Sequence, residues 1–319
     1  MDYFAGIKGQ ERALAALRQA LASGKISHAY LLAGPVGVGK LTTARALAQA
    51  IILGSDPQGE AYWREAAHPD FMYIEKMDNK TLIGIEQINR EMEPWLALKP
   101  YRAARRVVII NEAHLLSLPA ANALLKTLEE PPGHAVLILV ADELNLLETI
   151  VSRCQLIRFS PVGDVAVSDI LVQRGVEPSR AARLARLGQG SIAAALRWAE
   201  EEDLDGMREE ACALLQGLAR GGEIEVFKCA ERIEKNPALL TGLLTAILRD
   251  IYILQATGEK DLLVLADNLA LYRNFRQLDP GRVKSALEKV NGLSRQFRGP
   301  VNPLLLSINI SYLLQDGLK

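Results

Sequence analysis

One glycine-rich segment constrains the fold of this chain more than any other. Residues 34–40 read Gly-Pro-Val-Gly-Val-Gly-Lys, directly after the apolar run Ala29–Leu32 and before a helical pattern. In such a context the glycines let backbone N–H groups converge on phosphate oxygens, while the start of the helix and Lys40 add positive charge. The segment predicts a phosphate-binding loop, with a glycine-rich turn that holds no ligand as the alternative.

The first half of the chain alternates short apolar runs with helical patterns, which favours an α/β fold with a parallel sheet. Buried strands are expected at Ala29–Leu32, Phe71–Ile74, Val107–Ile110 and Ala135–Val140. Helices are expected at Arg12–Ser23, Lys40–Leu53, Ile83–Leu98 and Ala120–Glu130.

The second half carries helical patterns alone, so we expect three domains: an α/β core at 1–161, a small helical domain at 162–205 and an all-α domain at 206–319. An acidic run at 200–205 marks the second boundary. Three apolar stripes predict a helical bundle in the last domain, and an internal core is favoured over a surface that packs on other subunits. The stripes are Leu239, Leu240, Leu243, Leu244, Ile247, Leu248, Ile251 and Tyr252; Val283, Leu287, Val290, Leu293 and Phe297; and Leu304, Leu305, Ile308, Tyr312 and Leu313.

Composition excludes several classes of protein. A net charge of −1 argues against a protein whose main affinity is for nucleic-acid phosphates, so any DNA contact must be local. Three widely spaced cysteines fit neither a disulfide framework nor a zinc site, and we expect a cytoplasmic protein without a signal peptide. Arg249 and Asp250 interrupt the most apolar helix, so no membrane span is expected.

The positions that would hold a metal beside the loop are altered. Leu41 stands where a Ser or Thr hydroxyl would ligate Mg²⁺, and Thr42 is turned away by about 100° along the helix. After the strand Val107–Ile110, Asn111 replaces the usual Asp, whereas Glu112, which would orient the attacking water, is retained. These losses predict very slow ATP hydrolysis or none, although ATP or ADP can still bind through the degenerate loop formed by Gly34, Gly37, Val38, Gly39, Lys40, Leu41 and Thr42.

Several further motifs carry a more specific resemblance. The chain is similar to the clamp-loader ATPases of the AAA+ class over most of residues 1–161, and the distal helical regions match in layout. The resemblance implies an AAA+ core, a helical lid and a helical collar. It rests on Gly9-Gln10, Ser27-His28-Ala29-Tyr30, His68-Pro69-Asp70, Asn111–Leu116, Ala121–Pro132 and Ser152-Arg153-Cys154, with a weaker match at Asn302–Leu305.

The resemblance also implies roles for single residues. Arg153 falls on the arginine finger that completes the ATP site of a neighbouring subunit, and its alternative is a structural arginine paired with an acid. The two nucleotide-sensing positions fall on Ala141-Asp142 and on Ala193, which lack the usual groups. The profile is that of a silent member with an idle Glu112. The alternatives are an active ATPase subunit of the gamma/tau type, in which Thr42 or water rescues Mg²⁺, and an adaptor that never contacts DNA.

Partners and metals follow from the same resemblance. It implies gamma/tau-like ATPase subunits and a delta-like subunit as partners, with the sliding clamp and primer-template DNA reached through the complex. Many relatives carry a zinc knuckle, but Gly54–Ala67 contains no cysteine. We therefore expect no zinc, with Tyr62 or Trp63 packing there instead. A basic cluster just before the strand Val107–Ile110 is expected to be a solvated turn: Lys99, Arg102, Arg105 and Arg106. The alternative is that this cluster, together with Arg90, contacts DNA phosphates.

Overall fold

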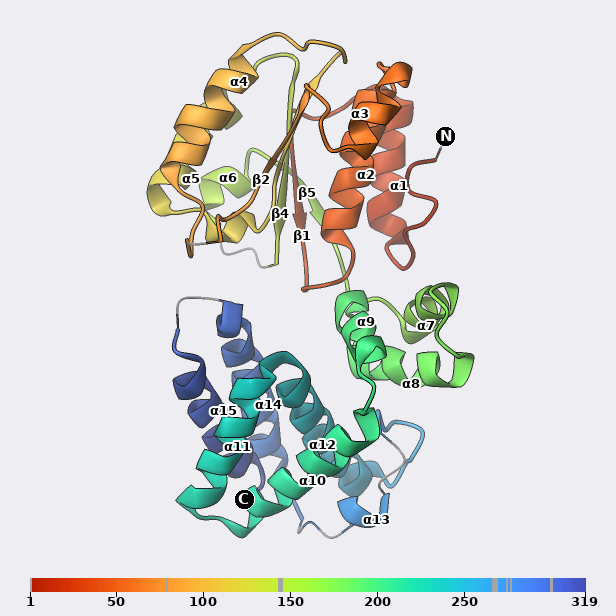
Figure 1. The fold of residues 1–319 in the computed structure, drawn as a ribbon, viewed down its shortest axis with the longest axis vertical. Helices are drawn as coiled ribbons and strands as arrows, with labels where there is room; N and C mark the ends of the chain where they lie inside the picture. Colours follow the sequence, from red (N-terminus) through yellow and green to blue (C-terminus); the bar gives the residue numbers. More distant parts are fainter. Residues whose placement is uncertain are drawn as a thin grey trace. The chain divides into compact units, whose positions relative to one another are not determined.

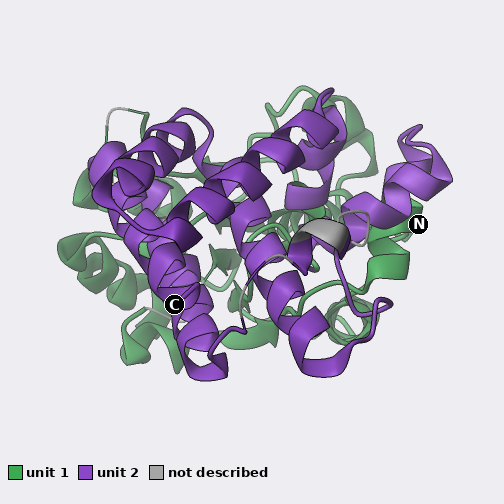
Figure 2. Cartoon of the chain, turned by 90° about the horizontal axis from the view of Figure 1, so that it is seen from below, with its two compact units in different colours: residues 1–170, 190–193 green, residues 171–189, 194–319 purple. Residues whose placement is uncertain are grey.

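The computed structural model describes residues 2–78, 80–142, 146–265, 269–273, 275, 277–298 and 301–319. The chain divides into two compact units, coloured separately in Figure 2. Unit 1 holds residues 1–170 and 190–193, and unit 2 holds residues 171–189 and 194–319. The expected boundaries of three domains, after residues 161 and 205, stay a prediction.

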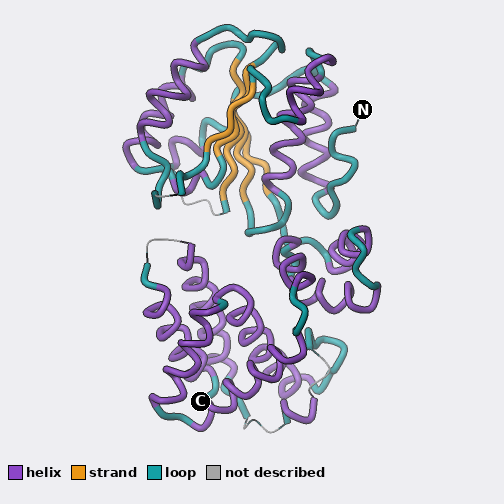
Figure 3. The backbone as a smooth tube through the Cα atoms, viewed as in Figure 1, coloured by secondary structure: helices purple, strands orange, loops and turns teal. Residues whose placement is uncertain are grey.

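Unit 1 is built on a parallel sheet of five strands in the order β2-β3-β4-β1-β5, drawn in orange in Figure 3. Every residue of the three central strands is buried, because helices cover both faces of the sheet. The strands are β1 (Ala29–Ala33), β2 (Phe71–Ile74), β3 (Arg106–Ile110), β4 (Ala135–Ala141) and β5 (Gln155–Arg158).

Two layers of helices flank the sheet, with α1, α2 and α3 on one face and α4, α5 and α6 on the other (Figure 1). The second layer closes an apolar core with β3 and β4, to which Ile88, Met92 and Leu124 contribute. The helices are α1 (Glu11–Ala22), α2 (Lys40–Leu53), α3 (Glu60–Arg64), α4 (Glu93–Ala97), α5 (Leu118–Glu129) and α6 (Glu148–Val151).

The four expected strands are confirmed to within one residue at either end, but two other features differ from the sequence prediction. Strand β5 was missed because only Ile157 of its four residues is buried, so it shows no apolar run. The expected helix Ile83–Leu98 is split into a π-helical segment, Gln87–Met92, and the short α4. Pro94 explains this change of helix type. Proline has no backbone N–H to donate, so the hydrogen-bond register of the helix changes around it.

The remaining elements described after β5 are mostly helical, as expected for the second half of the chain. Helix α7 (Asp164–Gln173) begins in unit 1 and extends into unit 2, and α9 begins at residues that belong to unit 1. The helices of the second half are α8 (Pro178–Gly188), α9 (Ile192–Glu200), α10 (Leu204–Arg220), α11 (Glu223–Lys235), α12 (Pro237–Thr257), α13 (Leu269–Tyr272), α14 (Pro280–Ser294) and α15 (Pro303–Gly317).

Helix α12 is the core of unit 2. It packs against α10, α11, α14 and α15, and the first predicted apolar stripe is mostly buried, as expected for an internal helix. By length and composition alone α12 is also apolar enough to cross a membrane, but 56% of that segment is buried within the protein. Asp250 is fully buried there, where it accepts hydrogen bonds from the N–H groups of Val264 (3.0 Å) and Leu265 (2.7 Å).

The stripe predicted on α15 does not form the internal face of that helix. Leu305 and Tyr312 remain 56% and 43% exposed, and the buried apolar side chains are Leu306, Ile310 and Leu314. The buried face was hidden in the sequence because it also contains serines. Their hydroxyl groups donate to carbonyl oxygens four residues earlier in the helix, so these polar groups are hydrogen-bonded although they are buried.

A phosphate loop at one edge of the sheet and an arginine at the other

The residues predicted to surround a nucleotide gather at the carboxyl ends of three neighbouring strands. The loop at 34–40 follows β1, Asn111 and Glu112 follow β3, and Asp142 follows β4. Carboxyl ends of parallel strands share one edge of a sheet, and this is where open α/β sheets bind ligands. The structure therefore brings these predicted residues to one edge.

The loop has the backbone that its glycines allow. Gly37 and Gly39 have φ angles of 76° and 97°, a region that other residues rarely adopt, and Gly39 precedes the first turn of α2. Gly34 is required for a different reason: a Cβ atom there would lie 2.3 Å from the carbonyl oxygen of Phe159. The loop is thus packed closely against the segment that follows β5.

Lys40 is buried within the loop, with only 4% of its surface exposed. Its ammonium group donates to the carbonyl oxygens of Gly34 (2.8 Å) and Pro35, and pairs with Oδ1 of Asp142 at 2.9 Å. An ammonium group has three N–H donors. Each of these donors can therefore be matched to an acceptor of the chain itself: the two loop carbonyl oxygens and the carboxylate of Asp142.

The two altered metal positions, Leu41 and Asn111, offer no negatively charged oxygen to a cation. Leu41 is half-buried and apolar, and Thr42 is exposed, in line with the predicted turn of its side chain away from the loop. The hydroxyl of Thr43 is fully buried and donates to the carbonyl of Gly39 at 2.9 Å. Among the described residues no group of three or more His, Cys, Asp or Glu is arranged to hold a metal.

Glu112 has a strained backbone. Its φ and ψ angles are 49° and 44°, in the left-handed region that costs a residue with a Cβ atom about 1 kcal/mol or more. Such strain is found most often at functional sites. Asn111 lies in the turn directly after β3, and its N–H donates to the carbonyl oxygen of Ile74 at 2.8 Å.

Two other segments hold the loop in place. The N–H of Ala193 donates to the carbonyl of Gly37 at 3.1 Å, in the turn where the second sensor was expected. A Cβ atom on Gly37 would lie 2.3 Å from Oγ of Ser191, so the turn and the loop are in direct contact. The buried amide of Gln10 donates to the carbonyls of Val38 (3.2 Å) and Ser160 (2.8 Å).

Arg153 lies at the opposite edge of the sheet. It stands two residues before Gln155, whose partner across the β1–β5 ladder is Tyr30. Gln155, the first residue of β5, is therefore level with Tyr30, four residues before the loop begins at Gly34, which is about 13 Å along the strand at about 3.3 Å per residue. Arg153 precedes this amino end of β5, whereas the phosphate loop follows the carboxyl end of β1.

The guanidinium group of Arg153 is held on the surface of unit 1. It pairs with Oε1 of Glu129 at 2.7 Å and donates to the carbonyl oxygen of Thr149 at 3.0 Å. Both side chains of the ion pair are partly exposed, at 36% and 52%. The contact with an acid is the one expected of a structural arginine, and it also leaves the group within reach of another molecule.

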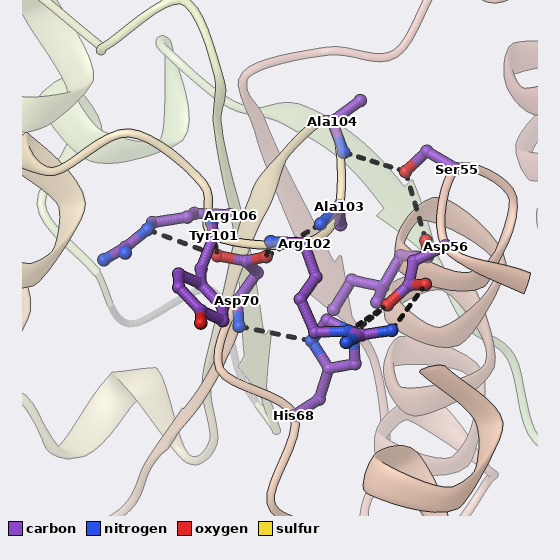
Figure 4. Close-up of polar contacts among 10 residues, drawn as sticks. Ser55, Asp56, His68, Asp70, Tyr101, Arg102, Ala103, Ala104 and Arg106 are labelled. Carbon is purple, nitrogen blue, oxygen red and sulfur yellow. Dashed lines mark hydrogen bonds and ion pairs between the residues drawn. The ribbon is translucent and has the colours of Figure 1, made fainter. Parts of the chain in front are cut away.

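The stretch where the resemblance placed a possible zinc knuckle is held together by a network of polar and charged side chains that the sequence did not predict (Figure 4). Asp70 is completely buried and accepts from the N–H groups of Tyr101, Arg102 and Ala103 at 2.7–2.8 Å. His68 accepts from the N–H of Asp70 (3.2 Å) and lies 3.3 Å from Asp56.

Asp56 joins this network to the loop before β3. Arg102 donates to both of its carboxylate oxygens, at 2.7 and 3.2 Å, and this contact lowers the pKa of Asp56. Trp63 packs against Phe71 with ring centroids 4.8 Å apart, and Arg102 lies over the ring of Tyr62, so both predicted aromatic residues are used in packing.

The prediction of a solvated basic turn was wrong for Arg106. This side chain is 6% exposed, lies over the ring of Trp95, donates to the Trp95 carbonyl and pairs with Asp70 at 3.5 Å. The inward direction was not visible in the sequence because the acceptors come from distant segments. With Arg102 bound to Asp56, only Lys99 remains fully exposed among the four positions next to β3.

The fold and the loop together define an α/β protein with a predicted phosphate loop, in which a parallel sheet is followed by helices. A family model described as "DNA polymerase III, delta subunit" matches residues 9–163. The chain is 26% identical to DNA polymerase III subunit delta' of Bacillus subtilis over 97% of both chains. It is 30% identical to subunit tau of the same organism, over 93% of this chain but 47% of the relative. Residues 9–163 thus match this family model, and nearly the whole chain is similar to a DNA polymerase III delta' subunit.

The tau and gamma relatives are longer proteins. The chain spans about half the length of the Bacillus subtilis tau subunit and 58% of the gamma subunit of Buchnera aphidicola, to which it is 30% identical. Among solved structures, a gamma subunit-related protein of Thermotoga maritima shares 19% identity over 95% of this chain and 99% of its own, with a TM-score of 0.44. That likeness is too low to bear on function.

Proposed function

We propose that this chain is a delta'-like subunit of a DNA polymerase III clamp loader, a largely ATPase-silent stator that supplies an arginine finger to a neighbouring ATPase subunit. The partners would be gamma/tau-like and delta-like subunits, with the sliding clamp and primer-template DNA engaged through the complex. The match of residues 9–163 to the family model and the similarity to a delta' subunit along nearly the whole chain support this assignment.

The observation that carries the proposal is the separation of two sets of residues. At the loop, Leu41 and Asn111 replace the two side chains that would hold Mg²⁺, and Mg²⁺ supplies much of the charge stabilisation in phosphoryl transfer. At the other edge, Arg153 precedes the amino end of β5, away from the loop of its own chain. A guanidinium there serves a phosphate in a second subunit better than one in its own chain.

The test is ATP hydrolysis by the loader assembled from this chain and its partner subunits. Arg153→Ala is expected to lower the ATPase rate of the complex at least tenfold, because an arginine finger in trans contributes about 10³–10⁵ to such reactions. Arg12→Ala, which removes an exposed arginine from α1, is the matched control and should leave the rate unchanged. An unchanged rate with Arg153→Ala would refute the finger.

The purified chain alone separates this proposal from an active gamma/tau-like ATPase. The silent stator is expected to hydrolyse ATP no faster than the buffer with Mg²⁺. Turnover at a rate ordinary for enzymes, roughly 1 per second or more, would favour the active subunit instead.

A further inference from the structure

The charge on the buried Lys40 is balanced within the chain. Asp142 follows β4, the strand beside β1, and its carboxylate meets the lysine at 2.9 Å at the edge where the loop begins. The loop carbonyls of Gly34 and Pro35 accept the other ammonium protons. A phosphate group that bound to this loop would need the same protons and the same charge.

The position of Asp142 is unfavourable for a second anion. The carboxylate side chain is only 20% exposed, so water screens it weakly. A nucleotide phosphate within reach of Lys40 would lie within a few ångströms of this carboxylate, and like charges at such a separation repel each other strongly when partly buried. Binding would therefore require the Lys40–Asp142 pair to open.

The shape of the loop is also set by contacts within the chain. Its middle is fastened to the turn at 190–193 through Gly37 and Ala193, and its last part to Gln10 through Val38. The close approach of Ser191 to Gly37 leaves no space for a side chain between them. These contacts hold the loop in its shape without a bound nucleotide.

We propose that Asp142 acts as a built-in anion that takes the place of a nucleotide phosphate at Lys40, so that the phosphate loop serves as a structural joint and ADP binds only when this pair is broken. The inference deepens the proposed function, because it concerns the same silent site. It identifies Asp142 as the residue that decides whether the loop accepts a phosphate.

The experiment measures ADP affinity of the full-length chain by isothermal titration calorimetry, with and without Mg²⁺. Wild type is expected to bind ADP weakly, with a dissociation constant above about 0.1 mM, and Asp142→Asn to bind at least tenfold more tightly. ADP is used because it has no γ-phosphate for the new amide to contact. Asp142→Thr is the second variant, in case the first does not fold.

Two controls make the result specific. Asp78→Asn removes an exposed carboxylate of unit 1 and should leave the affinity at the wild-type value. Adding Lys40→Ala to Asp142→Asn should abolish the gain, because the freed ammonium is its source.

Either of two results would overturn the inference: micromolar ADP binding by wild type, or folded Asp142 variants whose affinity stays within twofold of wild type. Neither result depends on Arg153, which is tested by the ATPase rate of the assembled complex. The inference and the proposed finger therefore fail separately.

Discussion

Glu129 pairs with Arg153, the residue proposed as an arginine finger, in the isolated chain. The two side chains meet at 2.7 Å on a partly exposed surface, and exposed pairs of this kind contribute about 0–1 kcal/mol. Such a contact can restrain Arg153 without preventing its transfer to a stronger anion. A phosphate in a neighbouring site, with its higher charge and bidentate geometry, is such an anion.

Glu129→Gln should therefore raise the ATPase rate of the assembled loader, by no more than about fivefold, because the amide competes less well for the guanidinium. The neighbouring Glu130→Gln is the matched control and should have no effect. Steady-state ATP hydrolysis by the two complexes gives the comparison. A lower rate with Glu129→Gln would mean that the glutamate positions the finger for catalysis instead of restraining it.

Asp70 is the residue on which the polar network of Figure 4 depends. It is fully buried, accepts three backbone hydrogen bonds and pairs with the buried Arg106. Asp70→Asn keeps the shape but leaves Arg106 without its counter-charge and turns one acceptor oxygen into a donor that faces N–H groups. The free energy of unfolding is expected to fall by about 2–4 kcal/mol.

Urea denaturation of the full chain measures this loss. Asp78→Asn, an exposed carboxylate on the same unit, should change the free energy of unfolding by less than about 0.5 kcal/mol. A loss equally small for Asp70→Asn would mean that the network is not what stabilises this stretch.

Among the helices, α8 begins at an unusual cap. Glu177 precedes Pro178 and accepts hydrogen bonds from the Ser179 hydroxyl and from the N–H groups of Ser179 (3.0 Å) and Arg180 (2.9 Å). These contacts, the hydroxyl first, lower the pKa of Glu177 to about 2 from an ordinary value of 4.5. Because the folded pKa is the lower one, the stabilisation is complete above pH 4.5 and is lost as the pH falls towards 2.

A carboxyl titration of the full chain by NMR should show Glu177 titrating near pH 2, with the amide signals of Ser179 and Arg180 changing together with it. Ser179→Ala removes the largest cause and should move the titration upward, towards 4.5. Titration of the unaltered chain at 4.5 would show that the cap does not form.

The elements also show why sequence predicted some features and not others. The central strands are apolar along their whole length, so their positions could be predicted closely. Edge strand β5 and the serine-lined face of α15 could not, because one has a single buried residue and the buried serines of the other bond within the helix. At the site, motif spacing located the loop and Glu112, whereas the Lys40–Asp142 pair depends on two strands meeting in space.

At the scale of the whole molecule, the residue proposed as the arginine finger and a surface of α15 that we propose to contact other subunits belong to different units. Arg153 is in unit 1, and the exposed apolar side chains of α15 are in unit 2. Leu305 and Tyr312 are seven residues apart, so they lie on one face of that helix, and both are exposed. Under the proposed function, this exposed apolar face of α15 would pack against other subunits of the loader.

Leu305→Asp should therefore weaken copurification with gamma/tau-like and delta-like subunits at least tenfold, because a charge would be buried at the contact. The melting temperature of the isolated chain should stay within about 2 °C, since Leu305 is 56% exposed in it. Arg153→Ala should do the reverse: it keeps assembly and lowers hydrolysis. If Leu305→Asp copurifies like wild type while the chain remains folded, the subunits are held together by another surface, and the assignment of α15 to the ring contact is wrong.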